Sequence, residues 1–153
     1  MDLKGKVAII TGSSMGLGAA IAMKLAARGI NVVINYTKSK GEAEAVKEAC
    51  ELKGADAITV QADVSKDEEC KKLVQVALDT WGRVDILVNN AGTTKFADHA
   101  DLDALQKDDF LWLYELNVVA PYQMIRACAP AMKKQGYGSV VNVSSIAAVT
   151  GIG

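Results

Sequence analysis

Thr11-Gly12-Ser13-Ser14-Met15-Gly16-Leu17-Gly18 is the stretch that decides the fold of this chain. It follows the apolar run Val7-Ala8-Ile9-Ile10, which is typical of a buried strand, and it opens a helix-like pattern. Its three glycines permit a tight turn and let the backbone approach an anionic ligand closely. The N–H groups and the dipole of the following helix would attract that ligand. The stretch predicts a phosphate-binding loop, although three glycines alone also fit an ordinary turn.

Apolar runs of strand length recur along the whole chain. They begin near Val7, Asn31, Asp56, Val84 and Ser139, and helical patterns separate them. Such alternation predicts a parallel sheet with helices on both faces, which is a doubly wound α/β fold of the Rossmann type. No repeat, linker or low-complexity tract interrupts it, so we expect residues 1–153 to form one dinucleotide-binding domain.

Two of the helical patterns make specific predictions. The first helix should place Leu17, Ile21 and Leu25 on one buried stripe. The helix after the third strand should begin with a capping box formed by Ser65 and Glu68, and it should carry packing residues without chemistry.

A third helical pattern runs from Phe110 to Lys134 and is apolar on nearly all sides. This suggests burial on several sides or a subunit interface, and we expect a homodimer or homotetramer for the full-length protein. Pro121 should kink or restart the helix because it has no N–H and its ring clashes with the preceding turn.

Composition excludes several classes of function. With 17 basic and 18 acidic residues among 153, the net charge is −1 and no basic excess points to nucleic acid. The apolar runs are shorter than the roughly 20 residues of a membrane span, and residues 1–6 lack the apolar core of a signal peptide. Cys50, Cys70 and Cys128 have no metal-ligand spacing, and His99 lies in a polar stretch typical of a solvated loop. We therefore expect a cytoplasmic protein without a metal site.

Three further motifs carry a family resemblance. Asn89-Asn90-Ala91-Gly92 follows the fourth apolar run, Asn117 lies inside the long helix, and Val143-Ser144-Ser145 ends the fifth run. Together with the glycine loop, they make the sequence similar to the short-chain dehydrogenase/reductase family over its whole length. β-Ketoacyl-carrier-protein reductases and sugar or alcohol dehydrogenases are the members it resembles, and the residues do not choose between them. The resemblance implies an oxidoreductase that transfers a hydride between a nicotinamide cofactor and a small-molecule carbonyl or secondary alcohol.

The resemblance also implies which residues bind the cofactor. Asp63 would accept a hydrogen bond from the adenine amino group while the Val64 backbone meets the ring edge, although Asp63 would also fit as a cap of the following turn. The residues after the fourth strand would contact the ribose, and their small size leaves room for the cofactor. The full set is Gly12, Ser14, Met15, Gly16, Leu17, Gly18, Tyr36, Thr37, Lys38, Asp63, Val64, Asn90, Ala91 and Gly92.

The choice between NADP(H) and NAD(H) depends on the residues that follow the second strand. An acidic residue there would bind the ribose hydroxyl of NAD, but residues 35–40 contain no carboxylate and do contain hydroxyls and two lysines. This favours NADP(H). NAD(H) stays open, because Met15 stands where relatives that use NADP often carry Arg or Lys.

Ser145 and Asn117 are the expected catalytic residues. By resemblance, Ser145 donates a hydrogen bond to the substrate oxygen, with Ser144 as the alternative. Asn117 would hold a water at a helix distortion, unless it only makes a local backbone bond. No Tyr-x-x-x-Lys, the family's proton donor and its partner, follows Ser145. We therefore expect a domain that lacks its C-terminal strands and helices and is inactive as given. The alternative is a truncated homologue that binds a nucleotide or a partner without catalysis.

Overall fold

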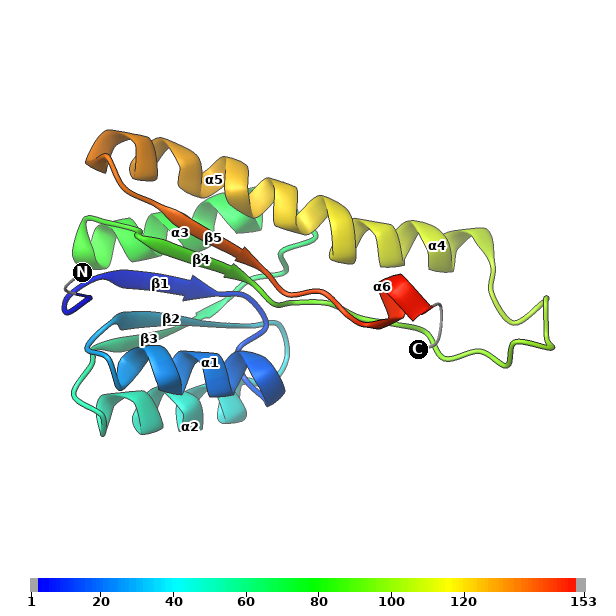
Figure 1. The fold of residues 1–153 in the computed structure, drawn as a ribbon, viewed down its shortest axis with the longest axis horizontal. Coiled ribbons are helices and arrows are strands. Elements are labelled where there is room, and N and C mark those ends of the chain that lie inside the picture. The colour runs from blue at the N-terminus through cyan, green and yellow to red at the C-terminus, as the bar shows by residue number, and fades with distance from the viewer. Residues whose placement is uncertain (1–2, 151–153) are drawn as a thin grey trace.

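Five parallel strands form the centre of the computed structural model, which describes residues 3–150 (Figure 1). The spatial order is β3-β2-β1-β4-β5, so the direction of strand succession reverses between β1 and β4. The fold is therefore the predicted α/β parallel sheet, and a crevice is expected at the carboxyl ends of β1 and β4. The strands are β1 (Val7–Ile10), β2 (Asn31–Tyr36), β3 (Ala57–Gln61), β4 (Ile86–Asn89) and β5 (Ser139–Asn142).

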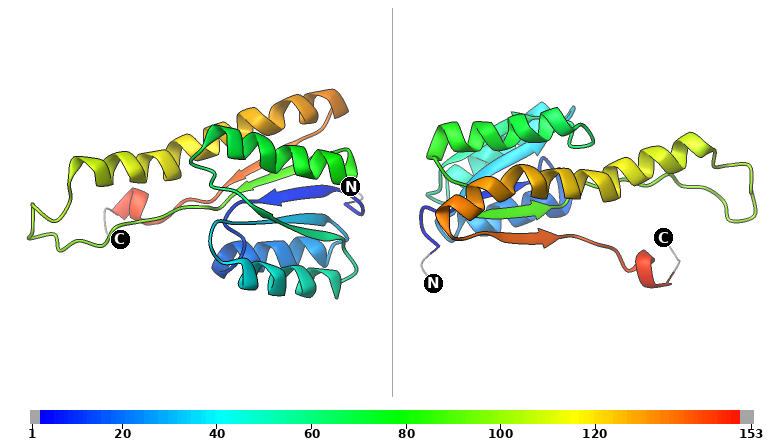
Figure 2. Two further views of the ribbon diagram at one scale, coloured as in Figure 1. Left: turned by 180° about the vertical axis from the view of Figure 1, so that it is seen from behind. Right: turned by 90° about the horizontal axis from the view of Figure 1, so that it is seen from above.

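Helices cover both faces of this sheet (Figures 1 and 2). One face carries α1 and α2, and the other carries α3 and α5. A continuous helical rod made of α4, a π-helical segment and α5 extends well beyond the sheet. The helices are α1 (Gly16–Ala26), α2 (Lys40–Glu51), α3 (Asp67–Trp81), α4 (Lys107–Tyr114), the π-helical segment Glu115–Val119, α5 (Ala120–Gln135) and α6 (Ala147–Thr150).

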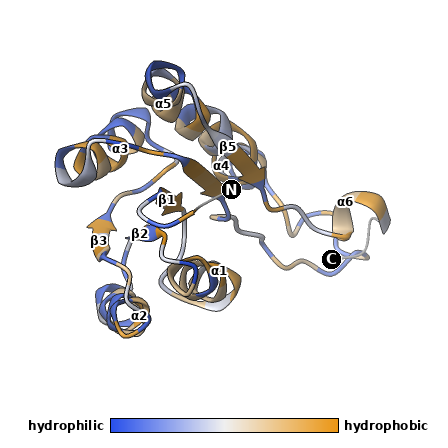
Figure 3. Cartoon of the chain, turned by 60° about the vertical axis from the view of Figure 1, so that its left-hand side comes forward, coloured by the Kyte–Doolittle hydropathy of each residue, from blue (hydrophilic) through white to orange (hydrophobic). Residues whose placement is uncertain are grey.

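Alternate residues of the strands enter two separate cores. Val7, Ile9 and Leu87 pack in the core under α3 and α5, whereas Ala8 and Ile10 pack in the core under α1 and α2. All of these side chains are buried, and burial stabilises a large aliphatic side chain by about 1.5–3 kcal/mol. Figure 3 shows the result as mostly orange strands between helices of mixed polarity. Burial on both faces explains why β1 is apolar without alternation.

The buried face of α1 differs from the predicted stripe. Leu17 is 58% exposed, and the residues of α1 that are buried are Gly18, Ala19, Ala22 and Ala26. Small side chains let this helix lie close to the sheet and to the loop after β4, whereas larger ones would hold it away. The prediction of a leucine and isoleucine stripe was therefore wrong at Leu17.

The start of α3 also differs from the prediction. The helix begins at Asp67 with Lys66 as its N-cap residue, so Ser65 and Glu68 form no capping box. Instead, the Ser65 hydroxyl donates to Asp63 Oδ1 at 2.7 Å. The local turn competes for this hydroxyl, and the helix begins one residue later than predicted.

The predicted distortion of the long helix is confirmed at the segment Glu115–Val119, which is π-helical. Pro121 is among the first two residues of α5, where its missing N–H leaves the regular ladder incomplete. Burial on several sides is wrong for α4, which has no buried residue. Large apolar side chains exposed on this rod are Phe110, Leu111, Trp112, Tyr114, Val118 and Tyr122.

A buried carboxylate ties β1 to β4 at the amino edge of the sheet. Asp85 accepts hydrogen bonds from the Val7 backbone N–H at 2.9 Å and from Arg83 Nε and Nη2 at 2.7 Å each. Lys6 Nζ lies 3.2 Å from its Oδ1. Burial raises the pKa of this carboxyl, but the hydrogen bonds from Arg83 and Val7 and the positive charges outweigh it. The pKa therefore lies below its usual value, and Asp85 is ionised at neutral pH.

Cys50, Cys70 and Cys128 are buried free thiols, and burial raises the pKa of Cys70 and Cys128 to about 12. Within residues 3–150, no group of three or more His, Cys, Asp or Glu side chains is arranged to hold a metal ion. In the same part of the chain, no helix is long and apolar enough to cross a membrane.

Candidate cofactor-binding site

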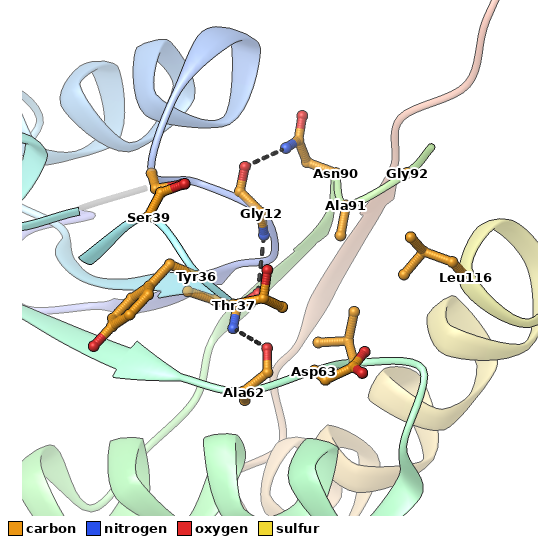
Figure 4. Close-up of a pocket in the computed structure, with 13 residues that line it drawn as sticks. Gly12, Tyr36, Thr37, Ser39, Ala62, Asp63, Asn90, Ala91, Gly92 and Leu116 are labelled. Atoms are coloured by element: carbon orange, nitrogen blue, oxygen red, sulfur yellow. Dashed lines mark hydrogen bonds between the residues drawn. The ribbon is translucent and has the colours of Figure 1, made fainter. Parts of the chain in front are cut away.

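A cavity of about 250 Å³ opens at the carboxyl edge of the sheet, among the segments that follow β1, β2, β3 and β4 (Figure 4). All four sequence motifs expected to bind a cofactor contribute to its lining. Met15, Gly16, Leu17, Gly18 and Lys38 do not line it. The lining residues are Gly12, Ser14, Asn35, Tyr36, Thr37, Ser39, Ala62, Asp63, Val64, Asn90, Ala91, Gly92 and Leu116.

The three glycines of the loop between β1 and α1 are required for two different reasons. Gly12 and Gly16 have φ values of 61° and 57°, in the left-handed region that disfavours side chains. Gly18 has no space for one: an added Cβ would lie 2.5 Å from Asn90 Nδ2 and 2.6 Å from the Gly12 carbonyl oxygen. The loop therefore turns tightly and packs directly against the segment after β4.

The start of α1 has the properties of an anion site. Met15 is the N-cap residue, and it makes no side-chain cap hydrogen bond. No acidic residue lies in the first turn, and the Met15 side chain is 55% exposed. The backbone N–H groups at the start of a helix have no partner within the helix, and the dipole adds positive potential there. This end of α1 fits a phosphate group.

Thr11 joins the glycine loop to the motif after β4. Its Oγ1 accepts hydrogen bonds from the backbone N–H groups of Asn90 and Ala91, each at 3.0 Å. In return, Asn90 Nδ2 donates to the carbonyl oxygens of Thr11 at 3.0 Å and Gly12 at 3.1 Å. The two motifs, almost 80 residues apart in the sequence, thus form one rigid wall of the cavity.

Asn35 is a lining residue that the sequence analysis did not single out. Its side chain is buried, accepts a hydrogen bond from the Gly12 N–H at 3.0 Å, and donates to the Ala62 carbonyl oxygen at 2.9 Å. One signal was available: Asn35 is a polar residue inside the apolar run from Val32 to Tyr36. A buried polar side chain needs partners, and here they belong to the loops on both sides.

The end of β2 supplies hydroxyl groups to the cavity. Tyr36 is buried, and Thr37 and Ser39 follow it along the lining, whereas Lys38 is exposed and is not a lining residue. Gln61 Nε2 donates to the Thr37 carbonyl oxygen at 2.8 Å and so fixes this turn to β3.

Asp63 caps its own turn as well as lining the cavity with Val64. Its Oδ1 accepts hydrogen bonds from the Ser65 N–H and hydroxyl, and Lys66 Nζ lies 3.6 Å from its Oδ2. Burial raises the pKa of Asp63, but the hydrogen bonds from Ser65 and the charge of Lys66 lower it by more. The pKa of Asp63 therefore lies below its usual value. Asp63 is therefore an ionised acceptor at neutral pH.

Asn117 lies in the π-helical segment, and both polar atoms of its side chain make hydrogen bonds to Thr93. Nδ2 donates to the Thr93 carbonyl oxygen and Oδ1 accepts from the Thr93 N–H, both at 2.9 Å. The partner is 24 residues away, so the interpretation of a local backbone bond was wrong. A Cβ on Gly92 would lie 3.1 Å from Asn117 Oδ1, which explains the small residue there. Asn117 thus holds the chain after Gly92 against the rod.

Ser144 and Ser145 follow β5 on the same edge of the sheet, but they do not line the cavity. Both are exposed, and Ser145 Oγ accepts a hydrogen bond from the Ala147 N–H at 3.1 Å. The edge itself is well defined, because Asn89 Nδ2 donates to Asn142 Oδ1 at 2.9 Å and ties β4 to β5. β5 is the outer strand of the described sheet, and the serines that follow it lie outside the cavity lining.

This chain is similar in sequence to curated proteins and similar in fold to solved structures. A 3-oxoacyl-acyl-carrier-protein reductase of Staphylococcus epidermidis is 37% identical, and the match covers 95% of this chain and 59% of that protein. An uncharacterized oxidoreductase of Methylorubrum extorquens is 42% identical, with 94% and 56% covered. The chain thus spans little more than half the length of these relatives.

Two solved structures have the same fold and a bound nicotinamide cofactor. A metagenomic short-chain oxidoreductase in complex with NADP has a TM-score of 0.87 and 35% identity, over 95% of this chain and 64% of that one. An NAD⁺-bound xylitol dehydrogenase has a TM-score of 0.90 and 29% identity, over 99% and 57%. The family model of the short chain dehydrogenases matches residues 6–153. This chain therefore belongs to the short-chain dehydrogenase/reductase family, as its motifs predicted.

Proposed function

We propose that this chain is the cofactor-binding part of an oxidoreductase that transfers a hydride between NADP(H) and a small-molecule carbonyl or secondary alcohol. The observation that carries the proposal is the cavity lined jointly by Gly12, Thr37, Asp63 and Asn90. Its lining reaches Ser14, next to the N-cap residue of α1, where phosphates could bind, and it includes hydroxyls after β2 and an ionised carboxylate after β3. A dinucleotide binds across the carboxyl edge of a parallel sheet, and these groups suit its phosphates, its ribose hydroxyls and its adenine.

The cavity and the adjoining start of α1 each have a distinct role in this proposal. The first turn of α1 binds the pyrophosphate through backbone N–H groups. Asp63 accepts a hydrogen bond from the adenine amino group, and the Val64 backbone contacts the edge of the adenine ring. The segment from Asn90 to Gly92 holds the ribose next to the nicotinamide. The cofactor supplies the hydride chemistry when it is bound. The protein supplies position, through a wall that Thr11 and Asn90 make rigid.

The preference for NADP(H) rests on the end of β2. Thr37 and Ser39 line the cavity, and no carboxylate lies among residues 35–40. An acidic side chain there would repel a 2′-phosphate, whereas hydroxyl donors and the nearby positive charge of Lys38 favour it. Solved structures of similar chains contain NADP in one case and NAD⁺ in another, so this chain's own residues carry the argument.

Replacing Thr37 with Asp tests the preference. The added carboxylate should weaken NADPH binding at least tenfold, about 1.4 kcal/mol, with little effect on NADH. Thr80→Asp is the matched control, since Thr80 is exposed near the carboxyl end of α3, at the other edge of the sheet. Calorimetric titration of both cofactors gives the ratio. An unmodified protein that binds NADH tenfold more tightly than NADPH would refute the preference.

For the chemistry, we propose that Ser145 polarises the substrate oxygen, with Ser144 as the alternative. Neither serine is tuned to deliver a proton, and the family's Tyr-x-x-x-Lys does not follow them within residues 1–153. We therefore propose that these residues alone bind the cofactor without turning it over. The apolar side chains exposed on α4 support the homo-oligomer that the sequence analysis expects for the full-length protein.

A further inference from the structure

We infer that Asn35 is a positioning residue of the cofactor site. Its side-chain amide sets the spacing between the glycine loop, where phosphates bind, and the segment from Ala62 to Val64, where the adenine binds. The inference rests on the proposed function, because it assigns the two walls to two parts of one dinucleotide. Asn35 lies in the interior of the sheet and contacts both walls.

The contacts of Asn35 bridge three neighbouring strands. Oδ1 accepts from the Gly12 N–H at 3.0 Å, and Nδ2 donates to the carbonyl oxygens of Ala62 at 2.9 Å and Val60 at 3.4 Å. In Figure 4, the dashed line from the Gly12 nitrogen and the one that ends at the Ala62 oxygen mark two of these bonds. Since β2 lies between β1 and β3, one rigid amide thus spans the distance between the two walls.

The orientation of this amide is determined by its partners. A backbone N–H such as that of Gly12 needs an acceptor, and the Ala62 and Val60 carbonyls need a donor, so only one placement of Oδ1 and Nδ2 satisfies all three. The Asn35 backbone is held as well: its N–H donates to Ser13 Oγ at 3.0 Å, and its carbonyl accepts from the Ser13 N–H at 2.9 Å. With the residue only 2% exposed, water cannot replace these partners easily.

The placement of Asn35 makes a distinct prediction for ligands of different length. A fragment that touches one wall needs only that wall, whereas a dinucleotide must reach both at once. When two binding parts are linked, the second binds at an effective concentration that depends on the match between the linker and the spacing of the sites. Loosening the spacing should therefore weaken the whole dinucleotide more than its two fragments.

Asn31 provides a matched control on the same strand. It is also an asparagine of β2, and its Oδ1 accepts a hydrogen bond from the Asp56 N–H at 3.1 Å, so it too bridges β2 to the chain of β3. Asn31 is the first residue of the strand and lies at the opposite edge from the cavity. Asn31→Ala removes one exposed hydrogen bond between β2 and the chain of β3 without touching either wall.

The experiment measures dissociation constants of NADPH, 2′-AMP and inorganic pyrophosphate for the unmodified protein and for Asn35→Ala, Asn35→Ser and Asn31→Ala. Asn35→Ser serves if the alanine variant does not fold, which thermal unfolding reports. We expect the loss of NADPH affinity in the Asn35 variants to exceed the product of the two fragment losses by about threefold or more. Asn31→Ala should leave all three constants within about twofold.

A smaller excess for NADPH, or an equal excess in Asn31→Ala, would overturn the inference, because a generally weakened fold affects both asparagines. Failure of the unmodified protein to bind NADPH would instead refute the proposed function. In that case amide hydrogen exchange still tests the bridge itself. Gly12 N–H exchange should accelerate in Asn35→Ala and not in Asn31→Ala, and unchanged exchange would refute the positioning role.

Discussion

Gly18→Ala is the substitution whose effect follows most directly from the structure. Gly18 lies in the first turn of α1, against the carbonyl oxygen of Gly12 and the side chain of Asn90. A Cβ added there would lie 2.6 Å from that oxygen, 2.9 Å from Ser13 Cα and 2.5 Å from Asn90 Nδ2. Two of these three atoms belong to the backbone, so a side-chain rotation cannot relieve the clash.

The expected cost can be estimated from two opposing effects. Forcing an extra carbon into a packed site costs about 1–3 kcal/mol, and backbone neighbours place Gly18 at the upper end of that range. Alanine in place of glycine in a helix returns at most about 1 kcal/mol. The net loss is therefore about 2 kcal/mol, which for a chain of this length lowers the melting temperature by about 4–8 °C.

Gly41→Ala is the control for this prediction. Gly41 is the second residue of α2, as Gly18 is the third residue of α1, but a Cβ added at Gly41 meets nothing within 4 Å. Its melting temperature should stay the same or rise slightly. Thermal unfolding by circular dichroism, followed by NADPH titration of the folded proteins, compares the pair. Equal melting temperatures for Gly18→Ala and the unmodified protein would show that the loop and the Asn90 segment are not packed as described.

Two further predictions concern the other edge of the sheet and the serines. Asp85→Asn should lower the free energy of unfolding by about 3 kcal/mol at pH 7, because the Arg83 and Lys6 charges lose their buried partner. Since the folded pKa of Asp85 is depressed, this contribution is complete above its unfolded pKa of about 4 and is lost as the pH falls through the folded pKa. Urea unfolding of both proteins at pH 7 and pH 3 should therefore show a smaller difference at pH 3, and a constant difference would contradict this assignment. In a form extended through the family's Tyr-x-x-x-Lys, Ser145→Ala should reduce ketone reduction by NADPH about 10²-fold or more, and a larger loss in Ser144→Ala would identify Ser144 as the catalytic serine instead.

The strand and helix succession was predictable because it depends on local spacing. Apolar runs followed by helical patterns indicate the parallel sheet, and each motif follows directly after a run. The carboxyl ends of parallel strands share one edge, so this alone places Gly12, Asp63 and Asn90 near one another. The helix distortion around Asn117 was predictable for a similar reason, since Pro121 acts on the turn that precedes it.

Contacts between distant segments could not be predicted in this way. The capping box at Ser65 failed because Asp63, folded back beside it, takes the Ser65 hydroxyl. The stripe at Leu17 failed because the closeness of α1 to Asn90 decides which face of the helix is buried. Asn117 binds the Thr93 backbone across a loop whose course no periodicity describes.

The amino-acid sequence by itself thus determined the fold class, the edge of the sheet that carries the site and the family, because these follow from local patterns and adjacent motifs. Only the tertiary structure decided the contacts between segments that are far apart in the sequence. The packing of the sheet brings Thr11 to Asn90, places Asn35 between two walls of the cavity and leaves Ser145 outside its lining. The physical reason is that hydrogen bonds between segments are set by the packing of the whole sheet, whereas sequence spacing reports only what each segment buries.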